Sequence, residues 1–131
     1  VENYKGLGDS LITSYQTYRA FLPEVHGALG KTKAPAAISL ILEDTNEDGH
    51  MILWDDYREP SDPETAFYYA VYAFPEGTRP DISDVRYLMS ISTNPYFILP
   101  SMERGMTYRY MVTAINRFWQ ESKPASIRIS Y

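Results

Sequence analysis

The sequence predicts an all-β fold, a seven-stranded antiparallel β-sandwich preceded by one N-terminal α-helix. Apolar residues recur with a helical period only near the start of the chain, and seven short β-rich segments follow. Turn residues, not helices, separate these segments, which favours antiparallel pairing because parallel strands need long crossover connections. We therefore divide the chain into residues 1–35, a helix and linker, and residues 36–131, the sandwich.

The helix is predicted over residues 7–22. Its apolar residues are spaced by four, four, three and four positions, which places them on one helix face. Pro23 ends the helix because proline lacks a backbone donor and clashes with the preceding turn. Residues 24–35 follow neither period and are predicted to be a linker. The apolar face consists of Leu7, Leu11, Tyr15, Tyr18 and Leu22.

Seven segments with strand character follow the linker. The third of them is apolar at every position, so both of its faces are predicted to be apolar, with Tyr69 and Val71 on one side. In the sixth, the side that carries Tyr108, Tyr110, Val112 and Ala114 is predicted to face the core. The predicted strands are 37–43, 50–55, 66–74, 85–91, 96–99, 107–116 and 125–131.

Composition excludes several function classes. The 131 residues suit one domain, and 44% hydrophobic, 22% charged and 15% aromatic residues are typical of a globular chain. A net charge of -5 without a run of Lys or Arg argues against nucleic acid as a partner. No apolar stretch approaches the roughly 18 residues that a membrane span needs. With no cysteine and no glycine-rich phosphate loop, we expect no thiolate metal site and no cofactor.

A stretch before and within the sixth strand carries a family resemblance. It resembles the fibronectin type III pattern G-T-x-Y-x-V-x-V-x-A-x-N, and Arg104 replaces the usual proline before its glycine. Trp54 resembles the tryptophan of the family's second strand. The resemblance implies an immunoglobulin-like sandwich in which Tyr108 buries its ring and donates its hydroxyl to nearby backbone. The implied structural residues are Trp54, Tyr69, Val71, Tyr108, Val112 and Ala114.

The whole chain is also similar to the C-terminal end of bacterial glycoside hydrolase family 10-like proteins, which pair a TIM barrel with this kind of module. The similarity lies in residues 15–23, 68–75 and 112–122. It implies that the chain is a non-catalytic accessory domain of a secreted, extracytoplasmic protein, located in the periplasm or at the cell surface. Its partner would be its own N-terminal catalytic domain, of which residues 1–35 are a remnant. The family's catalytic carboxylates lie on the barrel, so none is assigned here.

Aromatic residues are the candidate binding or docking residues. They lie on one face of the third strand and in the loop after the sixth, and we expect them to be exposed. Flat rings can stack on sugars or dock a neighbouring domain, so a second interpretation is an independent carbohydrate- or protein-binding module, with polysaccharide as a partner. The candidates are Tyr68, Tyr72, Phe74, Phe118 and Trp119.

Acidic residues offer two further candidates. Asp44, Asn46 and Asp48, followed by Gly49, match the first half of a calcium-binding loop. The competing interpretation is a hairpin turn, since these residue types tolerate tight turns. Five carboxylates crowd the next loop and suit either an acid/base pair or a solvated surface. They are Asp55, Asp56, Glu59, Asp62 and Glu64.

Overall fold

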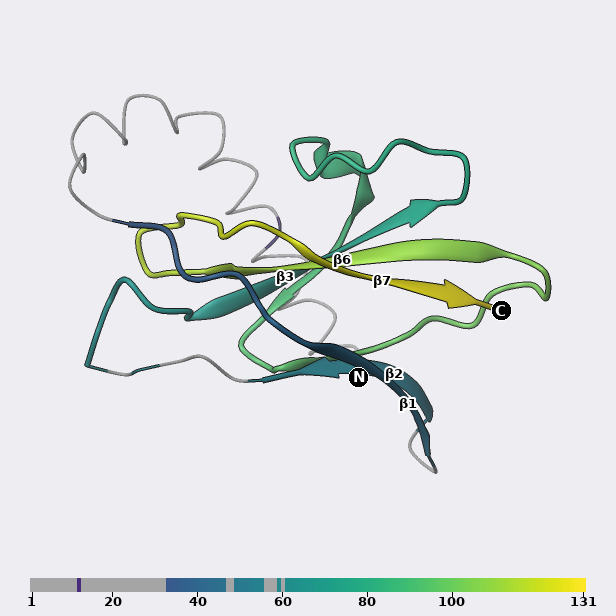
Figure 1. Cartoon of the computed structure of the whole chain (residues 1–131), viewed down its shortest axis with the longest axis horizontal. Coiled ribbons are helices and arrows are strands. Elements are labelled where there is room, and N and C mark those ends of the chain that lie inside the picture. Colours follow the sequence, from purple (N-terminus) through teal and green to yellow (C-terminus); the bar gives the residue numbers. More distant parts are fainter. Residues whose placement is uncertain (1–11, 13–32, 47–48, 56–58, 60) are drawn as a thin grey trace.

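The computed structural model describes residues 12, 33–46, 49–55, 59 and 61–131. These residues form a two-sheet antiparallel sandwich with strand orders β1-β2-β5 and β4-β3-β6-β7 (Figure 1), which confirms the predicted fold class. The predicted helix lies outside the described residues except for Ile12, which is helical. The elements are β1 Ile41–Asn46, β2 Gly49–Trp54, β3 Tyr68–Pro75, the 3-10 helix η1 Val85–Tyr87, β4 Leu88–Ser92, β5 Tyr96–Ile98, β6 Thr107–Ile115 and β7 Ala125–Ser130.

The first strand begins and ends later than predicted. β1 extends to Asn46, which pairs with Gly49 of β2 across a two-residue connection. The sequence pattern ended this strand at 43 because Asp and Asn disfavour strands, but the hairpin register holds Asp44 in the ladder opposite Met51. Gly49 has a φ of 124°, a backbone conformation that favours glycine.

The predicted strand 85–91 begins with a helical turn instead. The Asp84 carboxylate accepts hydrogen bonds from the Arg86 backbone N–H, 3.2 Å away, and from the Arg86 guanidinium, 2.6 Å away. The hydrogen bond from the Arg86 side chain lowers the pKa of Asp84. This local cap explains why η1 precedes β4. The other strands end within two residues of their predicted bounds.

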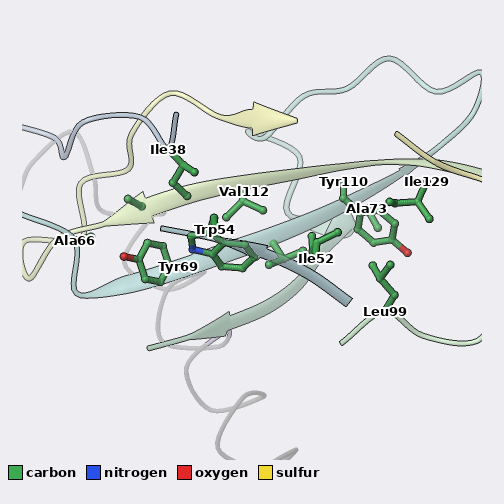
Figure 2. Close-up of a cluster of buried hydrophobic side chains, with 12 residues drawn as sticks. Ile38, Ile52, Trp54, Ala66, Tyr69, Ala73, Leu99, Tyr110, Val112 and Ile129 are labelled. Carbon is green, nitrogen blue, oxygen red and sulfur yellow. The ribbon is translucent and has the colours of Figure 1, made fainter. Parts of the chain in front are cut away.

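The main core lies between the two sheets (Figure 2). Tyr69 of β3 faces Trp54 of β2, and the two rings meet edge to face with centroids 5.5 Å apart. Val71 of β3 belongs to the same core. On β6 the predicted inward side is buried at Tyr110, Val112 and Ala114. The core also contains Ile38, Ile52, Ala66, Ala73, Leu99 and Ile129.

The hydrogen bond predicted for Tyr108 is not seen. Tyr108 is half-buried and packs against the main core, with ring centroids 6.2 Å from Tyr110 and 6.1 Å from Tyr131. A part-buried hydroxyl pair joins Tyr110 and Tyr131 instead, at 2.7 Å. Tyr131 is held in reach because its backbone bonds Gly105 and Met106. Tyr131 therefore supplies the hydroxyl partner at the start of β6, and Tyr108 contributes packing.

This hydroxyl pair predicts alkaline destabilisation. Burial, assisted by the bond to Tyr131, raises the pKa of Tyr110, and burial also raises that of Tyr131. A phenol whose folded pKa exceeds the unfolded value of about 10 adds stability that is complete below pH 10 and lost as pH rises above it. We expect the denaturation midpoint to fall more steeply above about pH 10 in the wild type than in Tyr110→Phe. Equal slopes in urea titrations across this range would contradict the assignment.

Candidate functional site

The outer face of the four-stranded sheet carries a second apolar cluster, which we call the outer cluster. The exposed face of a sandwich sheet is usually polar, because it meets water. The sequence predicted apolar residues on both faces of β3, and residues 69–74 of this strand are all buried. The outer cluster consists of Ala70, Tyr72, Phe74, Leu88, Ile91 and Ile115.

The predicted exposure of Tyr72 and Phe74 is wrong. Their exposed fractions are 0% and 1%. Tyr87 of η1 covers Phe74 with ring centroids 5.0 Å apart, and Ile82 packs on the same cluster. The sequence pattern did not predict that Tyr87 covers Phe74, because residues 85–91 were predicted to be a strand. Neither ring is available to stack on a ligand in this arrangement.

Ile12 also packs against the outer cluster. It belongs to the segment assigned to helix and linker, more than 50 residues before β3 in the sequence. A second attachment joins the linker to the sandwich, because the Asn116 side chain donates to the Lys33 carbonyl at 2.9 Å. The outer face is therefore contacted by the part of the chain that precedes the sandwich.

Asn116 organises the loop that carries Trp119. Its side-chain oxygen accepts from the backbone N–H groups of Phe118 and Gln120, each at 3.0 Å. Its amide nitrogen donates to Gln120 Oε1 at 3.0 Å. Asn116 is fully buried, so these bonds are shielded from water. The sequence pattern contained Asn116 but did not reveal this role, which depends on groups brought together by the fold.

Trp119 is held in an unusual backbone conformation. It has a φ of 61°, and no other non-glycine residue in the described chain has a positive φ. Such geometry costs free energy and persists where surrounding bonds enforce it, commonly at binding sites. The indole stacks on Tyr68 with centroids 4.9 Å apart and an interplanar angle of 15°. The structure thus brings Tyr68 and Trp119 together, both half-buried, with Phe118 half-buried beside them.

Two charged residues, to which the sequence assigned no role, contact side chains of the same sheet. The Arg117 guanidinium lies 4.8 Å from the centre of the Phe67 ring. The Glu121 carboxylate accepts from the hydroxyls of Tyr72 and Thr113, each at 2.6 Å. Because Tyr72 and Thr113 are buried, these two bonds give their hydroxyls a partner away from water. The similarity over residues 112–122 includes both Arg117 and Glu121 but assigned a role to neither.

The acidic candidates are only partly within the described residues. Asp48 and Asp56 lie outside them, and the calcium hypothesis stays a prediction. In the described part of the next loop, Asp62 accepts from the Glu64 backbone and Glu59 from the Ser61 hydroxyl, each at 2.9 Å. These carboxylates shape the loop. Among the residues that the structure describes, no three His, Cys, Asp or Glu gather as a metal site would require.

No described helical segment combines the length and the hydrophobicity needed to cross a bilayer.

The described carboxylates of the loop after β2 are all at least partly exposed. Asp55, like Glu59 and Asp62, is exposed, and Glu64 is half-buried. His50 bonds Glu43 at the far end of the three-stranded sheet, away from this loop.

Comparisons with known proteins address the fold. No protein-family model and no curated protein matches the chain. The solved structure of FN3tt mut is 13% identical, with a TM-score of 0.52, over 75% of this chain and 97% of that one. The chain has a fibronectin type III-like fold. At this identity the likeness of the fibronectin type III-like domain to other proteins concerns the fold alone.

Two larger proteins contain a similar domain. The spore cortex lytic enzyme SleM of Clostridium perfringens is 10% identical, with a TM-score of 0.51, over 74% of this chain and 28% of that enzyme. The twitchin kinase region of C. elegans is 15% identical, with a TM-score of 0.49, over 76% of this chain and 17% of that one. The fibronectin type III-like chain thus spans little more than a quarter of SleM.

Proposed function

We propose that this chain is a non-catalytic accessory domain that packs on a preceding domain and stabilises it. The observation that carries the proposal is the outer cluster, an apolar outer sheet face contacted by Ile12. Tyr87 and Ile82 of the sandwich cover part of this face, and Ile12, which precedes the sandwich in the sequence, packs on it as well, as expected where a preceding segment docks. In this proposal residues 1–35 are the end of the preceding domain and residues 36–131 are the accessory module.

We further propose that the parent is a secreted bacterial glycoside hydrolase-like protein. The similarity of residues 15–23, 68–75 and 112–122 to glycoside hydrolase family 10-like proteins supports this parent. The presence of a similarly folded domain in SleM, a spore cortex lytic enzyme, is compatible with it. An extracytoplasmic location, in the periplasm or at the cell surface, follows from the same proposal.

One observation favours a second function, carbohydrate binding by the chain itself. Trp119 is held by a strained backbone and stacks on Tyr68 at the surface of the sandwich. A half-buried indole that stacks on Tyr68 can still offer an edge or a partial face to a sugar. Tyr72 and Phe74 cannot contribute, because both are buried.

The two functions are separated by two variants of the whole chain. Docking predicts that Ile12→Asp lowers the unfolding free energy by about 2 kcal/mol, since a charge replaces an apolar contact. The matched control is Leu42→Asp, at a position that is 50% exposed on the other sheet and should change stability much less. Equal losses in urea unfolding would reject docking through Ile12.

The second readout is affinity electrophoresis through a soluble polysaccharide such as hydroxyethyl cellulose. Docking predicts no retardation of the wild-type chain. Retardation that Trp119→Ala abolishes would replace the docking proposal with carbohydrate binding. The two readouts use the same preparations, so a folded wild type serves as the reference for both.

A further inference from the structure

A hollow lies at the end of the outer face that is remote from Trp119. β3 pairs with β6 so that Tyr68 meets Ile115 at one end and Pro75 meets Tyr108 at the other. The hollow is at the Pro75 end and has a volume of about 340 Å³, which is the lower range of small-molecule sites. Its polar lining comes from Glu76, Thr78, Thr107, Arg109 and Arg128.

Two arginines stand opposite each other in this hollow. Arg109 of β6 and Arg128 of β7 are direct register partners, and like charges placed so on adjacent strands destabilise a sheet. Arg128 is paired with Glu76 at 2.6 Å. Arg109 has one hydrogen bond, to the Ser126 hydroxyl at 3.4 Å, and no carboxylate partner in the described part of the chain. The Arg109 guanidinium is therefore available to an external anion.

The balance of charge and donors indicates what kind of anion fits. Two arginines and one glutamate give the hollow a formal charge of +1, although the whole chain carries -5. A planar carboxylate matches both this charge and the bidentate fork of a guanidinium. Thr78 and Thr107 add hydroxyls, and Glu76 adds acceptor oxygens, at the same hollow. These groups suit a ligand that carries hydroxyls beside its carboxylate.

We propose that this hollow binds the carboxylate of a sugar acid through Arg109 and Arg128. The site goes beyond the docking function and does not rest on it, because it lies at the other end of the sheet from Trp119. Loss of sugar-acid binding would leave the Ile12 and Trp119 results unchanged. Conversely, failure of docking would leave this hollow and its charges in place.

The test is a titration of the whole chain with sodium glucuronate at constant ionic strength. Binding is measured from the change in NMR chemical shifts. We expect saturable binding of glucuronate and none of glucose, the neutral matched probe. Arg109→Gln should weaken glucuronate binding at least about tenfold, since it removes hydrogen bonds to a charged group. Arg109→Lys keeps the positive charge but loses the two-pronged guanidinium geometry. Its affinity for glucuronate should lie between those of the wild type and Arg109→Gln. Arg104→Gln is the control, because Arg104 is exposed and lies outside the hollow.

Several outcomes would overturn the proposal. Absence of saturable glucuronate binding would reject the site, and equal binding of glucose would reject carboxylate recognition. Sulfate binding more tightly than glucuronate would reject the choice of a carboxylate. If Arg104→Gln weakened glucuronate binding as much as Arg109→Gln, the anion would be attracted by positive charge in general and not by a site at Arg109. Arg109→Gln should fold at least as stably as the wild type, because the repulsion between Arg109 and Arg128 is removed.

Discussion

Replacing Asn116 with alanine should lower the free energy of unfolding by about 3 kcal/mol, because buried polar groups left unpaired cost roughly 1 to 3 kcal/mol each. The backbone N–H groups of Phe118 and Gln120 would lose their acceptor, and the carbonyl of Lys33 would lose its donor. Urea unfolding monitored by circular dichroism measures this loss. A decrease below about 1 kcal/mol would mean that water replaces the side chain without difficulty.

Asn116→Asp separates the two halves of this network. The variant keeps an oxygen for the Phe118 and Gln120 N–H groups but replaces the donor that faces the Lys33 carbonyl and Gln120 Oε1. An ionised aspartate in this buried position should be destabilising, and protonation restores a donor. We therefore expect Asn116→Asp to be less destabilising at pH 4 than at pH 7. The same loss at both values would argue against a buried donor role.

The second large effect is expected at Trp54. Its indole N–H is buried and has no acceptor among the described residues. Trp54→Ala should cost about 3 to 5 kcal/mol through the cavity left beside Tyr69. Trp54→Phe should cost only about 1 kcal/mol, since it keeps a ring in the core and removes a donor that is already unpaired.

The comparison of the two Trp54 variants decides between packing and hydrogen bonding. Calorimetric and urea-derived free energies should rank wild type above Trp54→Phe and both well above Trp54→Ala. If phenylalanine were as costly as alanine, the indole N–H would be making a bond that the fold requires.

Local patterns predicted most of the sandwich but not its irregularities. Alternation at β6 correctly placed Tyr110, Val112 and Ala114 in the core, because side chains on a strand point to opposite faces in turn. The same alternation could not show that a cap at Asp84 would turn the start of the next segment into η1. Nor could it distinguish Tyr108 from Tyr110 as the owner of the part-buried hydroxyl bond, since both lie on one face.

The candidate site shows the same division. Three of the aromatic candidates, Tyr68, Tyr72 and Phe74, were chosen because they lie on a second apolar face of β3, and that face exists. Their exposure was misjudged at Tyr72 and Phe74, because the covering residues come from η1, the loop before it and Ile12. Two contacts across distant positions, from Asn116 to Lys33 and from Tyr72 to Glu121, had no periodic signal.

By itself, the sequence determined that this chain forms antiparallel strands, where the inward face of β6 lies, and that its outer sheet face is apolar. These properties follow from residue type and a two-residue period, which are local. Only the tertiary structure decided which side chains are covered, that Arg109 stands opposite Arg128, and that Asn116 holds the Trp119 loop. Burial and side-chain pairing depend on the register between strands and on contacts between segments distant in sequence, and local residue patterns do not specify these contacts.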